Sequence, residues 1–322
     1  MLALALSVSI TFTSQKWVGG TSIYAPELEE KREVMHTAIL YNELPDSVES
    51  WSSLGSNGLN ARVLTVWIAE GIHQVAGLPI HRSYLVLETA ALLLCCLLLY
   101  AFLEPYTGWP FALGGLLYWG SILSLTYANH HFHPWDKPSI ALWLLALICT
   151  RQRRWWSLAA VLVVGVITKY DILVFPALVF LAYRRSEPWK TNVLRTAGLL
   201  ALTVSTFLVL RWLVPGGFEQ RDVVRQVMTN LMVIRDGWYF YPPFLAFGIP
   251  AVLAAMGYSI ADPFAKGCIQ LAVLVGLILF LQTNFVEVRA EVPLLLLLLP
   301  SAWYGLLRLA ATPAVRQIRD RR

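Results

Sequence analysis

Long apolar runs are the feature that most constrains what this chain can fold into. The hydrocarbon core of a bilayer is about 30 Å thick and needs roughly 20 apolar residues per helical span. Several runs meet that requirement, within a series near residues 2–13, 83–103, 107–128, 138–150, 155–168, 172–183, 195–213, 242–259, 267–282 and 292–309. We therefore predict an all-α fold, a polytopic bundle of about ten transmembrane helices that forms a single integral-membrane domain over residues 1–322.

Composition supports this prediction and excludes other classes of protein. Hydrophobic residues make up 57% of the chain and charged residues 14%, whereas soluble domains carry about 25% charged residues. The net charge of +5 comes from basic residues in short loops between apolar runs, which predicts membrane orientation and not nucleic-acid binding. Neither a dinucleotide-binding glycine fingerprint nor a P-loop is present. The four cysteines all lie in apolar runs, which indicates buried apolar residues and not a disulfide or zinc framework.

Two polar stretches interrupt the apolar runs, and we interpret both as outer loops. Residues 14–82 form the first, and an apolar stripe over 59–76 predicts a helix lying in the membrane surface. Residues 214–241 form the second, which contains an amphipathic helix over 219–235. The short run that precedes the first loop is either a first span or an uncleaved signal anchor.

The segment 155–183 decides the predicted topology. A single helix would place Lys169 and Asp171 near its middle, where a charge costs about 2.5–3.5 kcal/mol. Two short helices would place both residues in a turn, and they would also put the basic clusters at 151–154 and 184–195 on one side of the membrane. We therefore expect a break, with the turn at the floor of a cavity open to the outer side. Both termini are then cytoplasmic, in what we expect to be a bacterial inner (cytoplasmic) membrane.

On this topology, four polar features share the outer side: the first loop and the segments 129–137, 169–171 and 284–291. Ionisable groups at membrane depth are costly, so each is a candidate functional site. Such a site suits an amphiphilic substrate with a phosphate head and a long hydrocarbon tail. Lysine or arginine would hold the phosphate, and a carboxylate would accept a proton from an acceptor hydroxyl as general base.

Structural interpretations of the same residues stay open. Asp136 could be the N-cap of the following helix. Lys169 and Asp171 could form an internal ion pair, and so could Glu287 and Arg289. The acidic run at 27–33 is typical of a solvated face.

The order of the polar motifs resembles the GT-C superfamily of integral-membrane glycosyltransferases, which use polyprenyl-phosphate-linked sugars. The resemblance rests on the acidic first loop and on three later motifs. The acidic part of the loop leads to a surface helix with Asn60-Ala61-Arg62-Val63-Leu64. The three later motifs are His133-Pro134-Trp135-Asp136, Ile167-Thr168-Lys169-Tyr170-Asp171 and Glu287-Val288-Arg289. The resemblance implies a GT-C-like fold and transfer of a sugar from a polyprenyl-phosphate donor to an acceptor on the extracytoplasmic face.

The candidate residues follow from this chemistry and from the resemblance. In GT-C enzymes the base is typically an Asp or Glu in the first outer loop, which here offers only glutamates near the first span. The catalytic candidates are Glu33, Asp136 and Asp171. The substrate-binding candidates are Arg62, His133, Lys169, Glu287 and Arg289.

The cofactor and partner predictions are less specific. The histidines at 130, 131 and 133 lack the spacing of a helical or finger metal site, so we predict no metal ligands, although a divalent cation stays open as a cofactor. The expected partners are a polyprenyl-phosphate-linked sugar and membrane lipid, with a membrane protein partner as a further option. Two other functions remain as alternatives: a transporter or flippase of a lipid-linked solute, and a non-catalytic subunit of a membrane complex.

Overall fold

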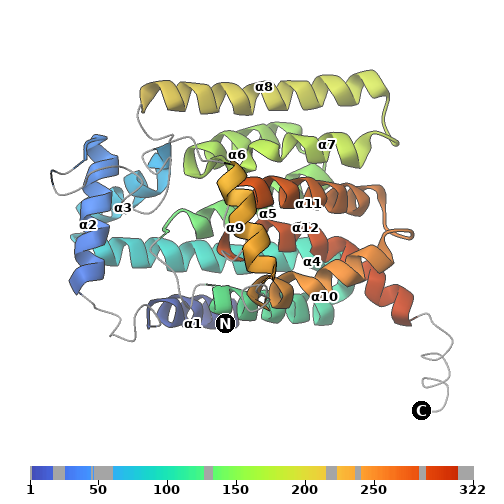
Figure 1. The fold of residues 1–322 in the computed structure, drawn as a ribbon, viewed down its shortest axis with the longest axis horizontal. Coiled ribbons are helices and arrows are strands. Elements are labelled where there is room, and N and C mark those ends of the chain that lie inside the picture. Colours follow the sequence, from blue (N-terminus) through green and yellow to red (C-terminus); the bar gives the residue numbers. More distant parts are fainter. Residues whose placement is uncertain are drawn as a thin grey trace, which may run out of the picture. The chain divides into compact units, whose positions relative to one another are not determined.

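The computed structural model describes residues 2–16, 26–44, 46, 61–126, 133–214, 223–235, 241–282 and 288–310. Every secondary-structure element in these ranges is helical, so the all-α prediction is confirmed (Figure 1). The elements are α1 (Leu2–Lys16), α2 (Pro26–Tyr41), α3 (Val63–Ala76), α4 (Ile80–Thr126), α5 (Asp136–Arg151), α6 (Trp155–Thr168), the 3₁₀ helix η3 (Tyr170–Val174), α7 (Pro176–Tyr183), α8 (Trp189–Leu213), α9 (Val223–Arg235), α10 (Tyr241–Gly257), α11 (Pro263–Gln282) and α12 (Val288–Ala310).

Four helical segments are long and apolar enough to cross a membrane: Ile80–Leu123, Trp189–Leu213, Pro263–Leu281 and Val292–Ala310. The first of these contains a break at Gly108, whose φ of 69° and ψ of 165° are not helical. Glycine adopts a positive φ at little cost, and Pro105 and Pro110 each lack an amide hydrogen for the helical ladder. The break lies near the boundary between the two predicted apolar runs, 83–103 and 107–128, and just inside the second.

The predicted break in segment 155–183 is present. Helix α6 ends at Thr168, Lys169 is extended, and after η3 a new helix begins at Pro176. Proline is favoured at the start of a helix because its missing N–H would have no partner there. The turn also needs Gly165, because a Cβ atom at that position would lie 2.8 Å from Cδ1 of Ile172.

Helix α2 was not predicted as a helix, since the first loop was expected to hold only the surface helix. The acidic residues Glu30 and Glu33 are exposed on α2, as expected of a solvated face. Its buried side, however, carries the polar residues Arg32 and His36 beside Met35. These polar residues interrupt the apolar stripe by which an amphipathic helix is recognised.

Contacts group the chain into two compact units. The first comprises Met1–Phe102, Leu116–Leu173 and Leu200–Gln220, and the second Leu103–Gly115, Val174–Leu199 and Arg221–Arg322. In the first unit, α3 packs against α2 and α6, and α5 packs against α6. A buried apolar cluster there joins Ile39 of α2, Val66 of α3, Tyr84 of α4 and Trp135.

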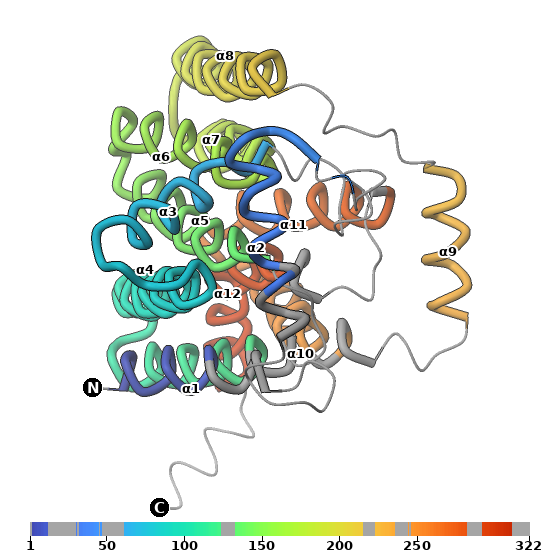
Figure 2. Tube along the Cα trace, turned by 90° about the vertical axis from the view of Figure 1, so that its left-hand side faces the viewer, coloured from blue at the N-terminus to red at the C-terminus, as the bar shows by residue number. Residues whose placement is uncertain are grey.

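In the second unit, α12 packs against α10 and α11, and α11 also packs against α7 (Figure 2). The contact between α10 and α12 depends on glycine at two positions. A Cβ atom on Gly305 would overlap the backbone of Leu253, and one on Gly257 would overlap the backbone of Ser301. Small residues that allow such close approach are characteristic of helix pairs in membranes.

Candidate functional site

Arg62 is a buried cation that lies at the N-cap of α3. Its side chain is over the aromatic rings of two residues from other segments, with Cζ 4.6 Å from the ring centroid of Trp135 and 5.7 Å from that of Tyr170. Such placement stabilises a cation by attraction to the ring quadrupole. Only 8% of Arg62 is exposed, and no carboxylate or other acceptor in the described part of the chain binds its guanidinium. The indole Nε1 of Trp135 is likewise buried without an acceptor among the described residues.

Lys169 lies between two carboxylates. Its Nζ is 3.0 Å from Oδ1 of Asp136 and 3.2 Å from Oδ2 of Asp171. Burial disfavours the ammonium, but the two carboxylates outweigh this effect and raise the pKa of Lys169. The geometry is that of one ammonium shared by two carboxyl groups.

The two aspartates differ in accessibility. The side chain of Asp136 is 1% exposed and that of Asp171 is 24% exposed. Ser139 Oγ and Trp143 Nε1 donate hydrogen bonds to Oδ1 of Asp171, at 3.2 Å and 3.5 Å. Asp171 is thus held in place and is also the carboxylate that a ligand can reach.

The alternative that Asp136 caps α5 does not hold, because Trp135 occupies the N-cap position and Asp136 begins the helix. The expected ion pair between Lys169 and Asp171 is present, but it is shared with Asp136. His133 is buried beside the same residues, with its ring centroid 5.5 Å from that of Trp135.

The structure brings together five of the eight predicted site residues: Arg62, His133, Asp136, Lys169 and Asp171. Glu33 is exposed on α2 and makes none of these contacts. Glu287 lies outside the described residues, and Arg289 belongs to the first turn of α12.

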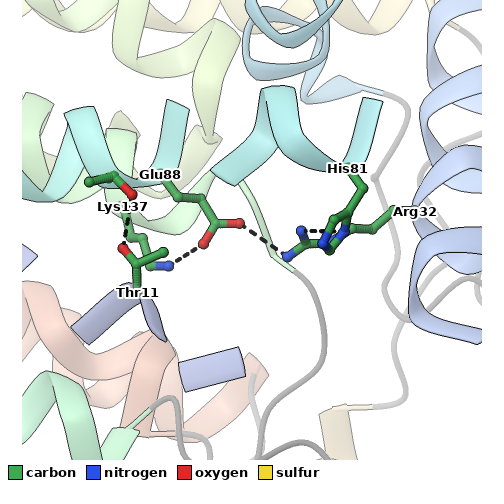
Figure 3. Close-up of polar contacts among 6 residues, drawn as sticks. Thr11, Arg32, His81, Glu88 and Lys137 are labelled. Atoms are coloured by element: carbon green, nitrogen blue, oxygen red, sulfur yellow. Dashed lines mark hydrogen bonds and ion pairs between the residues drawn. The ribbon is translucent and has the colours of Figure 1, made fainter. Parts of the chain in front are cut away.

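A second charged cluster was missed from the sequence. Glu88 is buried in α4 and pairs with Lys137 through Oε2 and with Arg32 through Oε1, the latter at 3.4 Å. Figure 3 shows Lys137 and Arg32 reaching this carboxylate from opposite sides. Arg32 also contacts Nδ1 of His81 at 3.0 Å. Because Lys137 follows Asp136 directly, the first turn of α5 contributes one charge to each cluster.

A third contact ties α2 to α3 and α4. His36 Nδ1 lies 2.9 Å from the hydroxyl oxygen of Tyr84, and Nε2 lies 3.0 Å from Oε2 of Glu70. Burial lowers the pKa of His36, against the opposing effect of the Glu70 carboxylate. The hydrogen bonds that Glu70 accepts from His36 and Gln74 lower the pKa of Glu70. Glu70 lies on α3, within the stretch 59–76 predicted as the surface helix.

The fold and the four apolar helices are those of an integral membrane protein. Across the described ranges, no group of three or more His, Cys, Asp or Glu side chains is arranged to hold a metal ion. No family model, no curated protein and no solved structure matches this chain.

Proposed function

We propose that the protein is a GT-C-type glycosyltransferase that moves a sugar from a polyprenyl-phosphate donor to an acceptor on the extracytoplasmic face of a membrane. The observation that carries the proposal is Arg62, a buried guanidinium without a carboxylate partner in the described part of the chain. It lies over the ring of Tyr170, the residue that precedes the accessible Asp171. Burying a charge without a partner is costly. A site that keeps such a charge is suited to an anionic ligand, and arginine recognises phosphate well.

The proposed topology has ten spans. Five come from the longest apolar helices, when α4 is counted as two helices separated at Gly108. The other five are α1, α5, α6, the segment η3–α7, and α10. This arrangement places both termini and the basic clusters at 151–154 and 184–195 on the cytoplasmic side. The turn at Lys169 then faces the outer side, where a lipid-linked sugar would be presented.

The proposed reaction assigns a role to Arg62, Trp135, Asp171 and Lys169. Arg62, with the indole N–H of Trp135, binds the phosphate of the donor. The Asp171 carboxylate accepts the proton of the acceptor hydroxyl as that oxygen bonds to C1 of the sugar. The bond between C1 and the phosphate oxygen breaks, and the electron pair leaves with the polyprenyl phosphate, whose charge Arg62 stabilises. Lys169 keeps the two aspartates in position.

Binding and transfer can be measured separately on the full-length protein in lipid nanodiscs with radiolabelled polyprenyl-phosphate sugars. Arg62→Gln should weaken donor binding roughly tenfold to hundredfold, because a hydrogen-bonded charge interaction of about 1.5–3 kcal/mol is lost. Asp171→Asn should leave binding close to the wild-type value and abolish transfer.

Arg82→Gln is the matched control, since Arg82 is an exposed arginine of the same unit, and it should change neither quantity. Donor binding that is equal in Arg62→Gln and Arg82→Gln would reject the phosphate site. Transfer that persists in Asp171→Asn would reject the assignment of the base.

A transporter is the second candidate, and the cluster around Glu88 favours it. Ionisable groups within a membrane-spanning helix often form proton relays in transporters, and Glu88 lies in the candidate span Ile80–Leu123. Proteoliposome uptake of a lipid-linked solute that requires Asp171, without any sugar transfer, would favour this function over the enzyme.

A further inference from the structure

Helix α9 (Val223–Arg235) has an exposed apolar side that the proposed reaction does not use. Val224 is 73% exposed, and Met228, Leu231 and Met232 are each about half exposed. These positions follow the spacing i, i+4, i+7 and i+8, so the four side chains line one side of the helix. Contiguous apolar surface of this kind marks an interaction site with a protein or a membrane.

The opposite side of α9 is anchored to the end of a candidate span. Asn230 is fully buried and donates a hydrogen bond of 2.6 Å from Nδ2 to the carbonyl oxygen of Phe280. Phe280 lies in the last turn of α11, whose span-length segment ends at Leu281. Since the end of a span lies near the boundary between hydrocarbon and headgroups, α9 is attached at that level.

The orientation of α9 agrees with a position in the membrane surface. Figures 1 and 2 both show α9 running crosswise to α11, which belongs to the same unit. A helix that crosses the end of a span in this way lies along the bilayer plane. Its 13 residues measure about 20 Å at 1.5 Å per residue, which is too short to cross the hydrocarbon core.

The charge of α9 indicates which membrane surface it would bind. Its charged residues are Arg225 and Arg235, and it contains no acidic residue. Basic residues beside an apolar face are typical of interfacial helices that bind anionic lipid, and each contributes to attraction by a negatively charged surface.

We infer that α9 is an interfacial helix that inserts Val224, Met228, Leu231 and Met232 into an anionic bilayer surface, with Arg225 and Arg235 at the lipid headgroups. The inference is independent of the reaction proposed above, since it concerns an element of the second unit. Because α9 is attached to α11, its position at the interface would set the depth of α11 in the bilayer.

The test uses one environment-sensitive fluorophore on the full-length protein in nanodiscs. The four native cysteines are buried, so a label can be directed to Met228→Cys or, as the matched control, to Thr229→Cys. Both native residues are exposed, but they face directions about 100° apart. The label at position 228 should be quenched several-fold more by spin-labelled phospholipid than by aqueous iodide, and the label at 229 should show the reverse.

Lipid charge provides the second arm. In nanodiscs with increasing phosphatidylglycerol in phosphatidylcholine, the blue shift of the label at 228 should require a several-fold higher anionic fraction once Arg225→Gln and Arg235→Gln are introduced. Equal iodide quenching at both positions, or identical lipid titrations with and without the arginines, would overturn the inference. Protection of position 228 from both quenchers would also overturn it, in favour of a second copy of the chain covering this face.

Discussion

The two charged clusters of the first unit are built from similar groups but differ in how completely the charges are paired. Glu88 accepts two cations, and all three side chains are buried. In the other cluster, Lys169 is shared by two carboxylates, one of which is accessible. The Arg62 guanidinium lies over two aromatic rings and has no carboxylate partner within the described residues. A cluster that satisfies its own charges holds helices together, whereas an incompletely paired cluster is ready to accept a ligand.

The largest effect on folding should come from Glu88→Gln. The substitution removes the buried carboxylate that Lys137 and Arg32 share, and breaking a buried pair in this way costs about 3–5 kcal/mol. We expect a large fall in the temperature at which the purified protein loses its monodisperse chromatographic peak. Glu104→Gln, at an exposed position of the same helix, should leave that temperature within about 2 °C of the wild type. Equal behaviour of the two variants would contradict the structural role of Glu88.

Lys169→Met should have an intermediate effect. It removes the ammonium that pairs with the buried carboxylate of Asp136, whereas Asp171 retains solvent and two hydrogen-bond donors. We expect a loss of about 2 kcal/mol, less than for Glu88 because one partner is partly hydrated. Combining Lys169→Met with Asp136→Asn should recover part of the loss in the same thermal assay. A double variant that is as unstable as the sum of the single changes would show that the pair is not coupled.

A smaller effect should appear in the pH dependence of stability. The pKa of His36 lies below its usual value of 6.5 in the folded protein because burial disfavours the imidazolium. The unfolded chain therefore takes up a proton at a higher pH than the folded protein does. As a result, the free energy of unfolding decreases as the pH falls from about 6.5 through the folded pKa. His36→Gln removes the titration, so the drop in melting temperature between pH 7.5 and 5.5 should shrink by about 2 °C. The same slope in both proteins would exclude His36 as its source.

The smallest effect on stability should come from Arg62→Gln. Arg62 has no carboxylate partner within the described ranges, so replacing it leaves no carboxylate there newly unpaired. We expect the free energy of unfolding to change by no more than about 1 kcal/mol. The two clusters should differ most clearly at this residue, because the same substitution should weaken donor binding strongly while changing stability little. A loss of stability as large as that of Glu88→Gln would mean that Arg62 holds the fold together and would remove the main support for a ligand site.

Much of the helical arrangement could be predicted from the sequence, because membrane spans leave a strong local signal. The break at Lys169 was predictable since a charge pair inside an apolar run is costly. Helix α2 was missed because Arg32 and His36 occupy its buried side and interrupt the periodicity. A helix whose buried face is polar can be recognised only once its partners are known.

The site was predictable in its members but not in its pairing. Arg62, His133, Asp136, Lys169 and Asp171 belong to motifs that stood out as polar, so they could be selected from the sequence. The contact of Arg62 with Trp135 and Tyr170 depends on tertiary packing and leaves no local trace. Glu88 was missed for a related reason, since one glutamate in a long apolar helix has no neighbour in sequence that reveals its two cations.

The adjacency of Asp136 and Lys137 has a consequence for communication within the molecule. The two residues are joined by one peptide bond. Asp136 pairs with Lys169 in one cluster, and Lys137 pairs with Glu88 in the other. A rotation or shift of this first turn of α5 therefore changes the geometry on both sides at once. A ligand that displaces Lys169 from Asp136 would be sensed at Glu88 and, through Arg32, at helix α2, with no intervening chain of small movements.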